Sequence, residues 1–320
     1  MRAVSGVIAV LRSAAARRVL GVGSAVLGLG TAGFTARHFA TAGWPIHEAN
    51  VWLIVVTGEL FVVAYGLKAW GWRYLFAEGR RPRVLTLAAA GGAASVGGVA
   101  LPGRFDEVIR IAVVRRCRGC TASLGAVGLS IVLVGLLDSA ALTPLASVAA
   151  AAAAPSTVFR IGLAIVAAAG IAAAAVVLLL PRLAAHRRVE RFRVAGWARE
   201  HAARPRAALA AWALIAGSWV VRGLALFILL KALSMGASLT LALAVLCASA
   251  ASAALPVAPA GQAMQVGAGA AVLVASGVHA EQAIAFSVAA QVLIVAAGAL
   301  FVVALGTDHV GARLRVALAH

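Results

Sequence analysis

Residues 51–69 read VWLIVVTGELFVVAYGLKA, an almost entirely apolar stretch with one carboxylate, Glu59, near its middle. An α-helix needs about 20 mostly apolar residues to cross the hydrocarbon core of a bilayer, and this stretch has that length. Side chains typical of the membrane–water interface follow it directly: Trp70, Trp72, Arg73 and Tyr74. We therefore predict that 51–69 spans a membrane, and we group Lys68 with the basic residues of the interface at its end.

The rest of the chain has the same character. Apolar residues make up 63% of the sequence and charged residues 12%, against about 45–50% and 25% in soluble domains. The other predicted spans are 20–36, 84–101, 122–148, 161–180, 207–230, 239–255 and 282–305. Two shorter segments interrupted by Gly or Pro, 103–118 and 259–277, complete the pattern. The sequence predicts an all-α, polytopic integral membrane helix bundle, with about eight spans plus two short interrupted or re-entrant helices, as a single membrane domain over 1–320.

The charge distribution indicates how the chain sits in the membrane. Lys and Arg number 28 and Asp and Glu 10, and in a membrane protein such an excess marks the cytoplasmic loops. Only Arg37, Arg160 and Lys231 fall in the loops predicted outside. We expect both termini in the cytoplasm and, because Arg, Ala and Gly usage is typical of a GC-rich bacterial genome, the bacterial inner membrane. The expected partners are membrane lipids with anionic headgroups. Nucleic acid is not expected, because no basic stretch is interleaved with aromatic residues.

The two short segments occupy corresponding places in the chain. A shift of 158 positions aligns Gly103 with Gly261, Glu107 with Gln265 and Gly119 with Gly277. The charge map gives the two copies opposite orientations, which raises the hypothesis of an inverted repeat with halves 19–150 and 158–306. Short interrupted segments at matching positions of inverted halves mark the binding site of many transporters. The alternative is chance similarity between helices rich in Ala and Gly.

The segment LPGRFDEVIR (101–110) holds most of the charge at membrane depth. Pro and Gly break the preceding helix there, so a new helix N-terminus would begin within the membrane and favour an anion. We expect a lipid phosphate to be bound by Gly103, Arg104 and Arg110, together with Gly261 and Gln265 of the second segment. Glu107 and Asp106 would orient these arginines. In the alternative reading, both acids merely complement the helix dipole or form structural ion pairs.

Three further charges lie within predicted spans. Asp138 is expected to pair with an arginine of the 102–110 cluster or to relay protons. Glu59 is a candidate buried carboxylate that is paired or protonated. Arg222 is a candidate for the same ion-pair set, although its long side chain could instead extend to the nearby interface.

No catalytic or metal-binding motif is visible. Cys117 and Cys120 form a lone CxxC, and Cys247 lies in an apolar run, so the thiols are read as incidental. The histidines have no ligand spacing. We therefore predict no catalytic residues, no metal and no cofactor. A lipid-modifying transferase is the remaining enzymatic alternative, and only Asp106 and Glu107 could serve it.

Two motifs are similar to those of a known family. LPGRFDEVIRIAVVRR (101–116), followed by Asp138 at the end of SIVLVGLLD, and LPVAPAGQAMQVGAGAAVLVASGV (255–278) resemble the flippase-like transmembrane region of bacterial lysyl-phosphatidylglycerol synthases, in its stand-alone form. The resemblance implies a lipid flippase and, without the soluble synthase domain, no lysine transfer. Three departures leave the substrate open. Arg-Phe-Asp stands at 104–106 where small residues are usual, Gln265 replaces a Glu, and Val-Gly at 134–135 replaces Glu-Arg.

The sequence thus predicts a lipid flippase that moves an anionic phospholipid or a polyprenyl-phosphate-linked lipid across the bacterial inner membrane. The alternative is a membrane scaffold that transports nothing and gathers envelope-biogenesis enzymes. The scaffold hypothesis predicts that the charges at membrane depth are purely structural, so that substituting them lowers abundance rather than activity.

Overall fold

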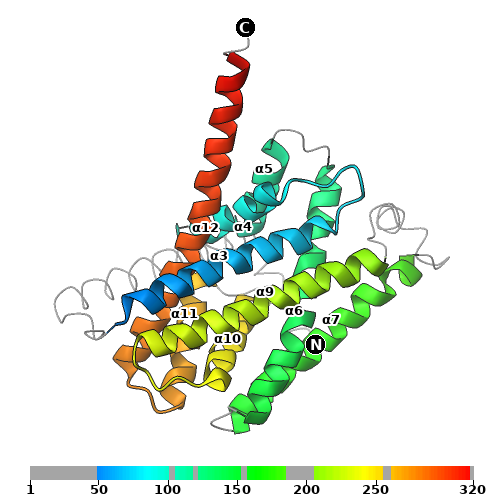
Figure 1. Cartoon of the computed structure of the whole chain (residues 1–320). Helices are drawn as coiled ribbons and strands as arrows, with labels where there is room; N and C mark the ends of the chain where they lie inside the picture. The colour runs from blue at the N-terminus through cyan, green and yellow to red at the C-terminus, as the bar shows by residue number, and fades with distance from the viewer. Residues whose placement is uncertain are drawn as a thin grey trace, which may run out of the picture.

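The computed structural model describes residues 49–100, 105–117, 122–152, 157–184, 205–254 and 261–317. These residues form helices and contain no strand (Figure 1). The helices are α3 (Val51–Arg73), α4 (Val84–Ala100), α5 (Phe105–Arg116), α6 (Leu124–Ala152), α7 (Thr157–Ala184), α9 (Pro205–Ala232), α10 (Leu239–Ala254), α11 (Gly261–Ala275) and α12 (Ala280–Ala317). The predicted all-α class is confirmed. The predicted span at 20–36 lies outside the described residues, as do Gly103 and Arg104.

Five of the described helices are long and apolar enough to cross a membrane: α3, α6, α7, α9 and α12. Their exposed faces carry large apolar side chains, among them Trp52, Ile165, Leu178 and Val303. A soluble protein would bury such continuous apolar surface, whereas lipid accepts it. The chain is therefore a polytopic membrane helix bundle.

The remaining helices form two hairpins. The predicted spans at 84–101 and 239–255 form α4 and α10, which have only 17 and 16 residues. Helix α4 packs against α5, and α10 packs against α11. The two short helices predicted from the interrupted segments are therefore present, and α4 and α10 are the first arms of their hairpins. Sequence hydropathy alone cannot separate such an arm from a full span, because both are equally apolar.

Small residues bring the helices close together. Helix α3 passes α9 at Gly71, where a Cβ would lie 2.9 Å from the carbonyl oxygen of Ala211. Helix α4 meets α12 at Gly92, where a Cβ would collide with the backbone of Gly298. In lipid, close packing of this kind replaces the hydrophobic effect as the main attraction between helices.

The order and packing of the helices repeat along the chain. In the order α3–α4–α5–α6, a long helix is followed by a two-helix hairpin and another long helix, and α9–α10–α11–α12 has the same order. Helix α6 packs on α9 as α12 packs on α3, and α4 packs on α12 as α10 packs on α6. Helices α3 and α9 run antiparallel, since the Asn50 amide at the start of α3 donates to the carbonyl oxygen of Ala232 at the end of α9 (2.9 Å).

Contacts between distant segments fix which loops share a side of the bundle. Arg83, just before α4, forms an ion pair with Asp308 near the end of α12 (2.6 Å). The loop after α3 and the distal part of α12 therefore lie on the same side, as the distribution of basic residues predicts. Helix α12 has 38 residues, and its distal part projects beyond the other helices (Figure 1).

Candidate functional site

Asp138 is a half-buried carboxylate on α6, and groups from two other helices bind it. Its Oδ2 atom lies 2.7 Å from Nζ of Lys68 on α3. Its Oδ1 atom accepts a hydrogen bond from the indole Nε1 of Trp219 on α9 (2.8 Å). A charge within the bilayer is costly unless it is paired, and Asp138, at the middle of α6, is neutralised in this way.

Lys68 was missed as a site residue because it stands near the end of its apolar run. Among the described residues, the charged partner of Asp138 is Lys68, whereas Arg110 of the 102–110 cluster pairs with Asp106. The helical period contains a signal that could have identified it. Phe61, Tyr65 and Trp72 are buried on α3, and Lys68 falls three or four residues from Tyr65 and Trp72, on the same face.

Arg222 lies over aromatic rings in the interior. Its guanidinium carbon is 5.0 Å from the ring centroid of Trp219 and 5.4 Å from that of Tyr65. The ring of Trp219 also carries Nζ of Lys68 at 5.5 Å. Its Nε atom is buried, and the residue as a whole is half-buried.

Arg110 completes what we call the interior charge cluster: Lys68, Arg110, Asp138 and Arg222. Both Arg110 and Arg222 lie close enough to Lys68 to repel its charge. Arg110 also pairs with Asp106 one turn earlier on α5 (3.3 Å). The structure thus brings together Arg110, Asp106, Asp138 and Arg222 from the predicted set, whereas Arg104 and Gly103 are outside the described residues.

The other predicted acids are placed differently. Glu107 is half-buried on α5 and has an interaction of its own. Glu59 is exposed on α3, which corrects the expectation of a buried carboxylate there. Gly261 begins α11, as the interrupted segment predicts.

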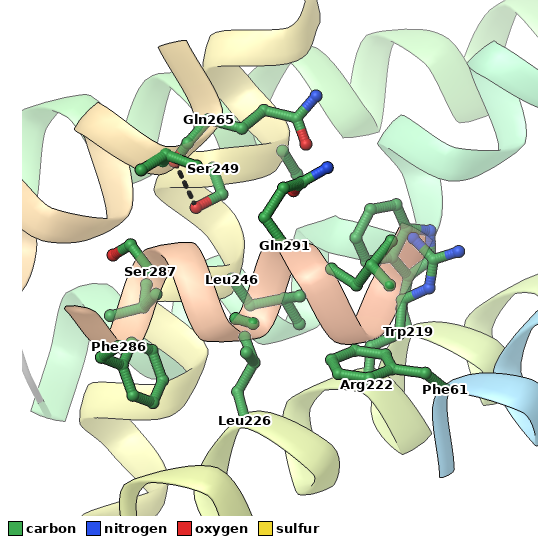
Figure 2. Close-up of a pocket in the computed structure, with 15 residues that line it drawn as sticks. Phe61, Trp219, Arg222, Leu226, Leu246, Ser249, Gln265, Phe286, Ser287 and Gln291 are labelled. Carbon is green, nitrogen blue, oxygen red and sulfur yellow. Dashed lines mark hydrogen bonds between the residues drawn. The ribbon is translucent and has the colours of Figure 1, made fainter. Parts of the chain in front are cut away.

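A cavity of about 80 Å³ lies beside Trp219 and Arg222, between α3, α9, α10, α11 and α12 (Figure 2). One water molecule occupies only about 15 Å³ on this measure, so the cavity has room for a larger group. Its polar lining residues are Arg222, Ser249, Gln265, Ser287 and Gln291.

The polar groups of the cavity come from α9, from both arms of the α10–α11 hairpin and from α12. Gln265, predicted from the second interrupted segment, lines it from α11, and its carbonyl oxygen accepts a hydrogen bond from Ser249 of α10 (3.1 Å). Figure 2 shows Gln291 projecting from α12, with Gln265 to one side and Arg222 to the other. Three polar residues outside the predicted site set therefore belong to this cavity: Ser249, Ser287 and Gln291.

A cysteine and a histidine also meet, at the cytoplasmic end predicted from the charge map. Sγ of Cys117 lies 3.8 Å from Nε2 of His309 and accepts a hydrogen bond from Thr86 (3.3 Å). Within the described segments, no group of three or more His, Cys, Asp or Glu side chains is arranged to hold a metal ion.

Comparison with known proteins agrees with the resemblance seen in the two motifs. The family model described as "Lysylphosphatidylglycerol synthase TM region" matches residues 9–306. Neither the curated proteins nor the solved structures contain a match.

Proposed function

The chain belongs to the family of lysylphosphatidylglycerol synthase transmembrane regions, and from this premise we propose that it is a lipid translocator. Its substrate would be an anionic phospholipid or a polyprenyl-phosphate-linked lipid, which it moves between the leaflets of the bacterial inner membrane. Both termini would lie in the cytoplasm. The family places the protein in membrane lipid metabolism or transport, and the step from there to translocation rests on the residues of the site.

The observation that carries the proposal is the interior charge cluster beside a polar cavity. Ionisable groups at membrane depth are expensive and are by default functional. Here Lys68 pairs with Asp138, and Arg110 and Arg222 lie near Lys68. A lipid headgroup that crosses the bilayer brings a phosphate with it, and a cationic interior lowers the cost of that passage.

The repeated helix order suggests how the site is reached. We propose that residues 19–150 and 158–306 are inverted repeats, related by exchange of α3–α6 with α9–α12. The antiparallel pair α3 and α9 and the exchanged packing partners support this. In transporters of this design, one half rocks against the other around a site at the bilayer midplane. The headgroup would pass along the site while the acyl chains stay in lipid.

Translocation in proteoliposomes tests the proposal. Fluorescent phosphatidylglycerol, phosphatidylcholine and a polyprenyl phosphate would be compared, using wild type, Lys68→Gln and Arg110→Gln. Lys231→Gln is the matched control, because this lysine is exposed and lies over the Phe227 ring away from the cluster. We expect wild type and the control to move an anionic lipid, and both cluster variants to be slower by about tenfold, the effect of losing about 1.4 kcal/mol of interaction.

The scaffold hypothesis remains the second candidate because two observed ion pairs satisfy charge within the protein itself: Lys68 with Asp138, and Arg110 with Asp106. It predicts that well-folded wild type moves no lipid and that the variants lose abundance. We further propose that the protein moves lipids without modifying them. Recovery of a chemically altered headgroup from the liposomes would contradict this.

A further inference from the structure

Two residues that line the cavity each carry a buried polar atom without a hydrogen-bond partner. In the part of the chain that the structure describes, three buried side-chain polar atoms lack a partner, and two of them are Nε of Arg222 and Oγ of Ser287. Both residues line the cavity between α9, α10, α11 and α12. Ser287 is only 6% exposed. Leaving such groups unsatisfied is costly, so their occurrence on two residues that line one cavity points to a ligand.

From these atoms we infer that the cavity is a receptor for a phosphate group, with Arg222 as its charged ligand and Ser287 as a second hydrogen-bond donor. The inference rests on the proposed function for its use in transport, but binding tests it separately. Arginine offers only donors, in a planar fork that fits phosphate oxygens. The hydroxyl of Ser287 and the amides of Gln265 and Gln291 can donate as well.

The charges around the cavity favour an anion over a cation. Of the described residues that line it, Arg222 is the only charged one, and none is a carboxylate. Asp138 already accepts from Lys68 and Trp219. A bound cation would therefore meet Arg222 without a counter-charge, whereas an anion would supply the counter-charge that Arg222 needs.

A repeated pair of residues shows why Arg222 rather than Lys68 is the receptor. Tyr65 and Lys68 stand as far from the start of α3 as Trp219 and Arg222 stand from the start of α9. Each half thus contributes an aromatic residue followed three positions later by a cation. In the first half the cation is neutralised by Asp138 of α6.

The second half lacks that internal counter-charge. The position of α12 that corresponds to Asp138 of α6, counted from the helix start, is Ile294, which is apolar and lines the cavity. Among the described residues no ion pair to Arg222 is found, and its guanidinium is held over Tyr65 and Trp219. One cation is thus paired within the protein, and the other is positioned for a ligand.

The cavity walls would strengthen the interaction. Phe61, Leu226 and Phe286 line it together with the polar groups. Apolar walls exclude water and lower the local dielectric, so a charge-assisted hydrogen bond is stronger there than at the surface. The aromatic stack also restricts the guanidinium before binding, which reduces the entropy lost when a ligand is bound.

Calorimetric binding in a neutral detergent tests the inference. The probes are inorganic phosphate, dihexanoyl phosphatidylglycerol and dihexanoyl phosphatidylcholine, applied to wild type, Arg222→Gln, Arg222→Lys and Ser287→Ala. Lys231→Gln on the same helix is the matched control. We expect Arg222→Gln to weaken phosphatidylglycerol binding at least about tenfold and Ser287→Ala to weaken it about threefold or more. Lys231→Gln should bind as wild type does.

The probes also separate the two sources of a phosphate group. Binding of phosphatidylglycerol without inorganic phosphate would identify a lipid headgroup, and binding of both would identify the phosphate itself. The inference would be overturned if the wild-type protein bound neither probe. It would also be overturned if Arg222→Gln and Ser287→Ala both bound as tightly as wild type. If Arg222→Gln does not fold, Ser287→Ala still tests the inference, because it removes only a single hydroxyl.

The outcomes distinguish this inference from the proposed function. Anion binding that depends on Arg222, in a protein that moves no lipid, would leave the receptor standing and remove the translocator. If the protein moved lipid but its Arg222→Gln variant bound the anion normally, the proposed function would stand and the receptor would not. Arg222→Lys keeps the charge but loses the planar fork, so we expect its affinity to lie between those of wild type and Arg222→Gln.

Discussion

At the scale of single residues, Trp219 organises the interior of the bundle. Its indole N–H donates to Asp138, and its ring carries the cations of Lys68 and Arg222. A cation over an aromatic face is worth about 2 kcal/mol or more when it is desolvated. One side chain therefore stabilises the carboxylate of Asp138 through its N–H and the two cations through its ring. It thereby couples α3, α6 and α9.

Asp138 and Lys68 should depend on each other for stability. We expect Asp138→Asn to destabilise the protein by about 1–3 kcal/mol, because it leaves the half-buried Lys68 without its charged partner. The double variant Lys68→Met/Asp138→Leu should be distinctly more stable than Asp138→Asn alone, because it buries no unpaired charge. Denaturant unfolding in detergent, monitored by circular dichroism, measures both. Equal losses in the single and double variants would contradict the pairing.

At the scale of elements, the sequence predicts where helices form better than it predicts how they pack against one another. The short helices predicted after the Pro- and Gly-containing stretches are both present, as α5 from Phe105 and α11 from Gly261. Hydropathy alone does not show that α4 and α10 are arms of hairpins, because it reports apolar length and not direction; the distribution of basic residues is what requires 103–118 and 259–277 to return the chain across the membrane. The Lys68–Asp138 contact joins residues 70 positions apart, and no local pattern specifies such a pair.

The meeting of α4 and α12 depends on the absence of side chains. A Cβ on Gly92 would collide with the backbone of Gly298, so we expect Gly92→Ala to force the helices apart and cost about 1–3 kcal/mol. Gly135→Ala on α6 is the control, since nothing lies within 4 Å of its added Cβ. It should be neutral or slightly stabilising. Thermal unfolding in detergent measures both variants, and a neutral Gly92→Ala would contradict the contact.

At the scale of the whole molecule, two interactions define the ends of the bundle. The Arg83–Asp308 ion pair marks one end, and the hydrogen bond from Asn50 to Ala232 joins helix termini at the other. Most basic residues of the chain belong to loops that the charge map assigns to the first end. In the proposed orientation, the end marked by the Arg83–Asp308 ion pair faces the cytoplasm.

Cysteine accessibility tests this orientation. In a background without Cys117, Cys120 and Cys247, we would introduce Arg80→Cys and His279→Cys, at two exposed positions. A maleimide that does not cross membranes should label His279→Cys in intact spheroplasts and Arg80→Cys only after lysis, because positive loops stay inside. The opposite labelling would invert the proposed topology.

Helix α12 is long enough to extend well beyond the membrane. Its 38 residues extend for about 57 Å, whereas the hydrocarbon core is about 30 Å thick. Helix α12 lines the cavity through Ser287 and Gln291, so any tilt that accompanies occupancy there would swing the distal end through an arc that grows with distance from the pivot. A fluorophore on that projecting part would convert a sub-ångström adjustment in the membrane interior into a readable displacement outside it.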